Sequence, residues 1–237
     1  YGGQAEHWPQ LVTVDSCAAT VGDEPVMIAA STQCPVVVGP DRVKDVEMLL
    51  DKHDCNIVLS DDGLQHYRLH RDIEIAVVDA RRLMGNGFCL PAGPLREPSR
   101  RLKTVDLVIY NGGKQAVSYT LEPGQLVSLA DRSVSTLDAF QGQTVHAVAA
   151  IGHPQRFFDL LEKQGLHLIK HSFADHYLYQ EEDLVFNDDL PILMTEKDAV
   201  KCTGFNISNS WYLPVTATLS ADAHSQFKQL IKQVCNG

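Results

Sequence analysis

Two adjacent carboxylates in the first half of the chain, Asp61 and Asp62, have the type and spacing to hold a divalent cation. The apolar run at 57–59 before them predicts a short buried strand, and Gly63 after them permits a turn. In open α/β sheets, ligands bind at the carboxyl ends of strands, and Mg²⁺ prefers oxygen ligands there. The same residues are also compatible with an ordinary Asp-Asp-Gly turn.

Two further groups of residues could handle a proton. Asp23 lies in Gly22-Asp23-Glu24-Pro25, where a helix cap and a general base beside a ligand are both reasonable interpretations. Asp175-His176 follows a predicted strand, and histidine is the usual proton carrier near neutral pH. A buried or capping histidine is nevertheless the commoner role of a lone His.

Basic residues gather around a Gly- and Pro-rich loop at 83–104, which we expect to be irregular and functional. Arginine pairs bidentately with phosphate, so the cluster is compatible with an anion site and equally with a solvated basic face. No phosphate loop of the G-x-x-x-x-G-K-[ST] form occurs in the chain. The basic residues are Arg81, Arg82, Arg96, Arg100, Arg101 and Lys103.

The elements that must position these residues alternate between strand and helix patterns, which predicts an α/β fold with a mostly parallel sheet. We expect a nucleotide-domain remnant at 1–122, a β-type linker at 123–142 and a smaller α/β domain at 143–237. Predicted strands lie at 11–14, 36–38, 57–59, 73–78, 105–110, 145–151, 166–173, 192–195 and 211–215, and predicted helices at 40–53, 154–164 and 221–234.

The composition excludes some classes of protein. The 237 residues carry a net charge of −10, which argues against broad nucleic-acid binding. Six cysteines without C-x-x-C spacing argue against a zinc ribbon and favour a reducing compartment. No run approaches the roughly 20 apolar residues of a membrane-spanning helix. Because the first residue is Tyr1 rather than Met, we expect the natural amino terminus to lie upstream.

Taken together, these segments resemble the tetraacyldisaccharide 4′-kinase (lipid A 4′-kinase) family. The similarity extends in family order over nearly the whole chain, and the long Leu-Pro-Ala-Gly-Pro-Leu-Arg-Glu segment is its most specific part. The matching stretches are Tyr1-Gly2-Gly3, Gly22-Asp23-Glu24-Pro25, Asp61-Asp62-Gly63-Leu64-Gln65-His66, Gly85-Asn86-Gly87, residues 90–97, residues 150–154, Asp175-His176 and Thr195-Glu196-Lys197-Asp198.

The resemblance implies a P-loop-type kinase that transfers the γ-phosphoryl of ATP to the 4′-hydroxyl of tetraacyldisaccharide 1-phosphate, a glycolipid, giving lipid IVA. It implies ATP and Mg²⁺ as cofactors, a location at the cytoplasmic face of the bacterial inner membrane, and no nucleic-acid partner. The family carries a membrane-associating segment and a phosphate loop before the Tyr-Gly-Gly stretch. The chain is therefore expected to be amino-terminally truncated, without its own phosphate-binding loop, and inactive alone.

The family roles transfer to matching positions of this sequence. Asp61 and Asp62 are implied to hold Mg²⁺, as in a Walker-B-type pair. Asp23 is implied to be the catalytic base, and His176 its partner from the second domain, so that domain closure would complete the site. The residues implied to line the sugar and phosphate pocket are Gln65, His66, Arg96 and Glu97.

Two other functions stay compatible with the residues alone. A carboxylate pair without a phosphate loop also suits a Mg²⁺-dependent sugar-phosphate phosphoesterase. A chain that lacks the phosphate loop also suits a non-catalytic glycolipid-binding fragment.

Overall fold

The structure, a computed structural model, describes residues 7–235, which form two compact units. Of the described residues, unit 1 contains 7–59 and Pro123–Pro214, and unit 2 contains Ser60–Glu122 and 215–235. Both units contain parallel strands with helices, so the predicted α/β class is confirmed. The units interleave in sequence, whereas the predicted domains at 1–122, 123–142 and 143–237 are sequential; that division stays a prediction.

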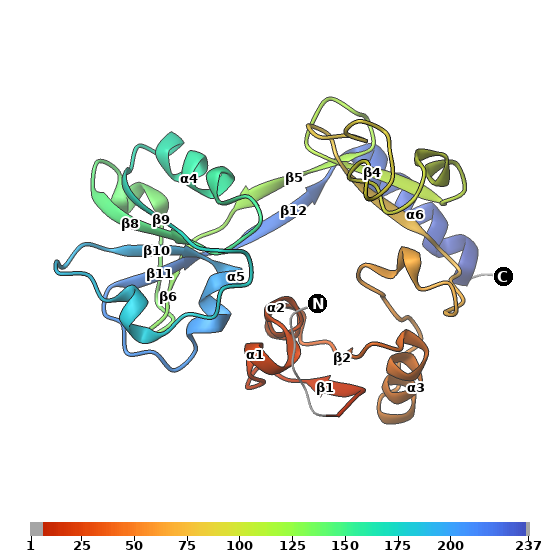
Figure 1. The fold of residues 1–237 in the computed structure, drawn as a ribbon, viewed down its shortest axis with the longest axis horizontal. Coiled ribbons are helices and arrows are strands. Elements are labelled where there is room, and N and C mark those ends of the chain that lie inside the picture. The colour runs from red at the N-terminus through yellow and green to blue at the C-terminus, as the bar shows by residue number, and fades with distance from the viewer. Residues whose placement is uncertain (1–6, 236–237) are drawn as a thin grey trace. The chain divides into compact units, whose positions relative to one another are not determined.

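Unit 1 is built on a six-stranded sheet (Figure 1). Four of its strands run parallel in the order β11-β10-β8-β9. On the other side of β11, β6 pairs antiparallel with β11, and β7 pairs antiparallel with β6. The strands are β6 (Leu126–Ser128), β7 (Val134–Ser135), β8 (Thr144–Ala149), β9 (His167–Ser172), β10 (Ile192–Thr195) and β11 (Ser210–Leu213).

Apolar side chains cover this sheet on both faces. Helix α4 (Pro154–Lys163) connects β8 to β9 and buries Phe157, Phe158 and Leu161, with Pro154 at its first turn, where no backbone donor is lost. The second apolar cluster includes Leu184 and Cys202. Burial raises the pKa of the Cys202 thiol to about 12, so this thiol is an inert packing group.

The amino-terminal part of unit 1 packs onto the same sheet domain. It comprises an antiparallel pair, β1 (Gln10–Val12) and β2 (Val36–Val38), and the helices α1 (Ala18–Val21), α2 (Asp23–Thr32) and α3 (Arg42–Lys52). Val21, Val26 and Ala29 form a buried cluster against which Val200 packs. This apolar contact fixes α2 beside the residues that follow β10.

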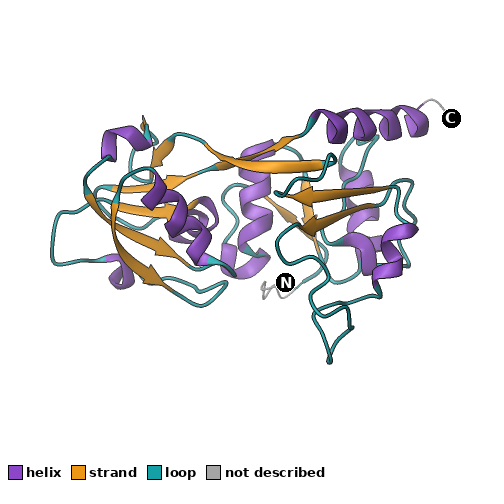
Figure 2. Ribbon diagram, turned by 90° about the horizontal axis from the view of Figure 1, so that it is seen from above, coloured by secondary structure: helices purple, strands orange, loops and turns teal. Residues whose placement is uncertain are grey.

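Unit 2 has a four-stranded sheet in the order β12-β5-β4-β3, in which β3, β4 and β5 are parallel (Figure 2). The elements are β3 (Ile75–Asp79), β4 (Leu107–Asn111), β5 (Ser118–Pro123), β12 (Val215–Leu219) and α6 (Ala221–Cys235). The predicted loop at 83–104 is confirmed, since its only helical part is the 3₁₀ segment Ser99–Lys103.

Most predicted elements have their counterpart, but two predictions are wrong. Residues 57–59 form no strand, and their side chains are exposed, that of Leu59 to 86 %. An apolar run becomes a strand only where another strand satisfies its backbone groups, and no described strand pairs with this segment. The single strand predicted at 211–215 is divided between β11 and β12 by Pro214, which lacks the N–H a ladder needs.

Within residues 7–235, the helices are too short or too polar for any of them to cross a lipid bilayer.

An Asp-His-His chain of contacts lies in the unit 1 sheet. His146 on β8 is buried, with Nδ1 2.9 Å from Nε2 of His171 on β9 and Nε2 3.0 Å from Oδ1 of Asp188. Both imidazoles stack on Phe186. Burial, followed by the charge of His146, lowers the pKa of His171, so the folded unit favours the neutral ring.

The stability of the protein should therefore depend on pH through His171. Below about pH 6.5 the unfolded state binds a proton at this residue more readily than the folded state, so the free energy of unfolding should fall as pH falls. His171→Gln should flatten this slope in urea unfolding followed by circular dichroism. His167→Gln, an exposed change on the same strand, should keep it. An unaltered slope in His171→Gln would contradict this assignment.

Candidate active site

Asp23 is the first residue of α2 and is held there by its own backbone. Gly22 before it has φ 97°, a conformation that favours glycine, and the Asp23 Oδ1 accepts the Glu24 N–H at 2.9 Å. The side chain is only 6 % exposed. A carboxylate at this position is stabilised by the positive end of the helix dipole.

His176 reaches Asp23 from the turn that follows β9. Its φ is 59°, in the left-handed region, and its N–H donates to Oδ1 of Asp175 at 3.1 Å. The ring Nδ1 lies 3.2 Å from both carboxylate oxygens of Asp23. An ionised carboxylate only accepts hydrogen bonds, so the imidazole N–H is the donor. The structure thus brings together the two residues for which a catalytic partnership is predicted.

Lys197 completes this group, although the sequence analysis assigned it no role. It lies in α5 (Glu196–Ala199), with Nζ 2.8 Å from Glu24 Oε1 and 3.9 Å from oxygens of both Asp23 and Asp175. Burial acts to lower the pKa of Lys197, but the hydrogen bond to Glu24 and the three carboxylate charges outweigh it and raise that pKa. The only signal in the sequence was the charged run directly after a strand.

The turn that carries Lys197 is fixed by a buried ion pair. Thr195 caps α5 by accepting the Asp198 N–H. Asp198 is fully buried and accepts from Thr195 Oγ1, from the Ala150 N–H and from Lys201 Nζ, the last two contacts at 3.1 Å and 2.7 Å. These bonds hold the loops after β8 and β10 together.

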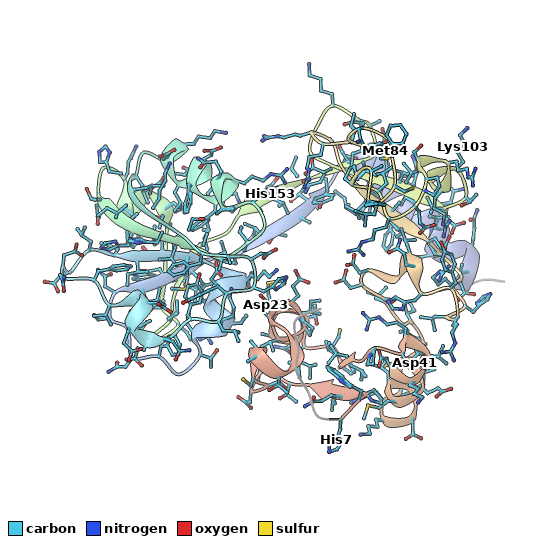
Figure 3. The ribbon with its side chains drawn as sticks, viewed as in Figure 1. His7, Asp23, Asp41, Met84, Lys103 and His153 are labelled. Atoms are coloured by element: carbon cyan, nitrogen blue, oxygen red, sulfur yellow. The ribbon has the colours of Figure 1, made fainter. Side chains whose placement is uncertain are left out.

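The site therefore forms at the carboxyl ends of three neighbouring parallel strands. The loop after β8 contains Gly152, where an added Cβ would lie 3.3 Å from Asp175 Oδ2. The loop after β9 supplies Asp175 and His176, and the helix after β10 supplies Lys197. The amino end of α2 adds Asp23, which Figure 3 labels. Ligands of α/β sheets bind at such strand ends.

A cavity of about 260 Å³ lies elsewhere along α2, between Met27 and Ala30 on the helix and Ala199 and Phe205 after β10. Glu196 also lines it, and burial raises the pKa of this glutamate. Lys197, the next residue along the chain, contacts Asp23, so of two consecutive residues one lines the cavity and the other lies in the candidate site.

The predicted metal and pocket residues lie in unit 2. Asp61 and Asp62 are exposed, Asp62 has φ 51°, and its Oδ2 is 3.8 Å from an Arg96 guanidinium nitrogen. Across residues 7–235, no three His, Cys, Asp or Glu side chains form a group able to hold a metal ion by themselves. Asp61 and Asp62 can therefore supply some, but not all, of the ligands of a metal ion.

Gln65 and Glu97 contact each other directly. Glu97 accepts from Gln65 Nε2 at 2.8 Å and from the Tyr67 hydroxyl, and these hydrogen bonds lower the pKa of Glu97. His66 is half-buried, and its carbonyl accepts from Arg71 at 2.9 Å. The predicted pocket residues Gln65 and Glu97 thus pair with each other, and the predicted pocket residue Arg96 lies beside the predicted metal ligand Asp62.

Arg101, a member of the basic cluster, has a carboxylate partner. Its guanidinium lies 2.7 Å from both oxygens of Glu74, and Arg71 binds the same carboxylate. Hydrogen bonding to Arg101 is the main cause that lowers the pKa of Glu74. This arginine therefore braces the loop rather than presenting an open anion site.

Comparison with known proteins identifies the group of proteins to which this arrangement belongs. The family model described as tetraacyldisaccharide-1-P 4′-kinase (LpxK) matches residues 1–236. Tetraacyldisaccharide 4′-kinases from Hahella chejuensis and Nitrosococcus oceani are 52 % and 50 % identical over 93 % and 98 % of the chain. The chain covers 67 % and 70 % of those relatives, about two thirds of their length.

The fold agrees with this relationship. A crystal structure described as the "apo" form of LpxK from Aquifex aeolicus in complex with ATP superposes with a TM-score of 0.76, at 24 % identity. The match covers 98 % of this chain and 76 % of that one. The chain belongs to the tetraacyldisaccharide-1-P 4′-kinase family, a family of kinases, which confirms the resemblance found in the sequence.

Proposed function

We propose that the protein containing this chain transfers the γ-phosphoryl group of ATP to the 4′-hydroxyl of tetraacyldisaccharide 1-phosphate, a step of lipid A biosynthesis. Family membership supports this reaction over a phosphoesterase or a purely binding role. The ATP in the Aquifex aeolicus structure supports the choice of nucleotide. The observation that carries the proposal is the contact between Asp23 and His176 at 3.2 Å.

In this reaction, Asp23 accepts the proton of the sugar hydroxyl. Phosphoryl transfer depends chiefly on positioning and charge stabilisation, with a carboxylate orienting the attacking hydroxyl. The ring N–H of His176 lies within hydrogen-bonding distance of both Asp23 oxygens and so fixes the orientation of the carboxylate. The imidazole is 39 % exposed and the carboxylate 6 %, so His176 is the more solvent-accessible member of the pair.

Asp61 and Asp62 fit a magnesium ion that binds together with nucleotide phosphates. Mg²⁺ in such sites takes one or two carboxylates and completes its shell with water and phosphate oxygens. Both carboxylates are exposed and adjacent, as that arrangement requires. When bound, the ion would neutralise charge on the phosphate oxygens. In the proposal, Asp61 and Asp62 are thus assigned to the metal ion and Asp23 to the proton of the same reaction.

Gln65, His66, Arg96 and Glu97 are proposed to line the pocket for the sugar and its phosphate. The hydrogen bonds that Glu97 accepts from Gln65 and Tyr67 fix the positions of the Gln65 and Glu97 side chains before substrate binds. Arg96, exposed beside Asp62, is the residue of the four suited to a phosphate.

We further propose that the protein works at the cytoplasmic face of the bacterial inner membrane. A four-chain acyl disaccharide is itself a lipid, so the enzyme must meet it at a bilayer surface. The loop at 83–104 exposes Leu83, Phe88 and Leu90 close to Arg81 and Arg82, a combination suited to anionic lipid headgroups with apolar tails beneath.

The Asp23 and His176 roles predict specific losses of activity. Asp23→Asn and His176→Gln should each lower kcat by roughly 10²–10⁴-fold, the usual contribution of a positioned acid or base. The assay measures transfer of labelled phosphate from ATP to tetraacyldisaccharide 1-phosphate, using the longest natural chain that contains this sequence. The exposed changes Asp51→Asn and His167→Gln should leave kcat within about twofold. Wild-type-like activity in either site variant would remove that residue from the mechanism.

The metal assignment predicts a separate effect. Asp61→Asn and Asp62→Asn should raise the Mg²⁺ concentration required for half-maximal rate about tenfold or more, since each removes a charged oxygen ligand. Titration of the initial rate with Mg²⁺ at fixed ATP measures this. Asp72→Asn, an exposed change in the same unit, serves as the control. A Mg²⁺ requirement equal to that of the unchanged protein would refute the assignment.

The membrane proposal predicts that Phe88→Ser with Leu90→Ser weakens vesicle binding at least about threefold, because each exposed apolar side chain contributes through its buried area. Flotation with vesicles of anionic and neutral phospholipid gives the measurement. Val185→Ser, an exposed apolar residue in unit 1, is the matched control. Equal flotation of all variants would count against this loop.

A further inference from the structure

Lys197 lies where three acidic side chains converge from two parts of unit 1. Its ammonium is within 4 Å of Glu24 and Asp23 on α2 and of Asp175 after β9. The side chain is 17 % exposed, so its charge is partly desolvated. A lysine kept charged in such surroundings requires carboxylate partners, and the three carboxylates within 4 Å of its ammonium all belong to the site.

The α5 turn is held by contacts that do not involve Lys197. The α5 turn is already capped by Thr195, and the neighbouring Asp198–Lys201 pair ties it to the loop after β8. Both charges of that pair are buried, 0 % and 1 % exposed. Lys201 therefore stabilises the fold, whereas the charge of Lys197 contacts the carboxylates of the candidate site.

The charge balance shows what Lys197 does. The carboxylates of Asp23, Glu24 and Asp175 all lie within 4 Å of this one ammonium, and the partly exposed imidazole of His176 also contacts Asp23 and Asp175. Like charges at such distances repel and disfavour the ionised forms. Anionic substrates such as nucleotide and sugar phosphates would meet this repulsion as well.

We propose that Lys197 is a positioning residue of the phosphoryl-transfer site: its ammonium offsets the negative charge at Asp23 and holds Asp175 and the His176 turn against α2. The inference rests on the proposed function, because it assigns Lys197 a part in the proton transfer to Asp23. It adds a third element, α5, to a pair formed by α2 and the turn after β9.

The test compares Lys197→Met with Lys197→Arg in the kinase assay, using the longest natural chain. Lys197→Met should lower kcat by about 10–100-fold with little change in KM, since misplacing a reacting group costs on that order. The acidic limb of its kcat–pH profile should move to higher pH, because a cation that favours the carboxylate form is gone. Lys197→Arg, which keeps the charge, should restore most of the rate and return the profile. Lys163→Met, exposed at the end of α4, should behave as wild type.

Four outcomes decide whether the inference holds. A lower kcat with a shifted pH profile and an unchanged thermal midpoint supports the inference. A lower thermal midpoint with an unshifted profile shows a structural role and overturns it. If wild type is active and Asp23→Asn is not, yet Lys197→Met matches wild type, the inference alone fails. If wild type transfers no phosphate from ATP to the disaccharide, the proposed function fails first and the inference falls with it.

Discussion

The parallel alignment of β10, β8 and β9 is the constraint on which the candidate site depends. Neighbouring parallel strands have their carboxyl ends at the same edge of the sheet, so the loops that follow these strands lie close together there. The contact between Asp23 and His176 then joins residues 153 positions apart, and it persists because Val200 packs against the apolar cluster that contains Val26 and Ala29 of α2. The apolar packing thus supplies the free energy that holds a polar pair with little intrinsic stability of its own.

Two lysines in one short segment show how burial separates a structural from a functional charge. Lys201 is buried against Asp198, a carboxylate whose other hydrogen bonds go to backbone and Thr195, so every polar group of that cluster is satisfied internally. Lys197 faces carboxylates that are partly exposed and that line the site. Breaking the buried Lys201–Asp198 pair would cost much of the free energy of folding, whereas the more exposed contacts of Lys197 can rearrange when an anionic substrate alters the local electric field.

Much of the fold was predictable because periodicity is a local property. The strand at 192–195 and the helices at 40–53, 154–164 and 221–234 follow directly from apolar spacing. The strand at 57–59 was wrong because local pattern cannot say whether a partner strand exists. Asp23 and His176 were found through the resemblance, whereas Lys197 was missed, since a lysine's partners are set by tertiary contacts among three distant segments. The pairing of Glu97 with Gln65 and of Arg101 with Glu74 was invisible for the same reason.

The chain passes between the two units three times, at 59–60, 122–123 and 214–215, and the passages differ physically. Two of them are adjacent strands: β5 ends at Pro123, β12 begins at Val215, and the Gly124 N–H donates to the Pro214 carbonyl at 2.9 Å. The third, at 57–60, has no strand partner among the described residues. Proline fixes φ at 123 and 214, so each of the two paired passages has one free backbone rotation fewer than an ordinary pair of residues, whereas the passage at 57–60 contains no proline.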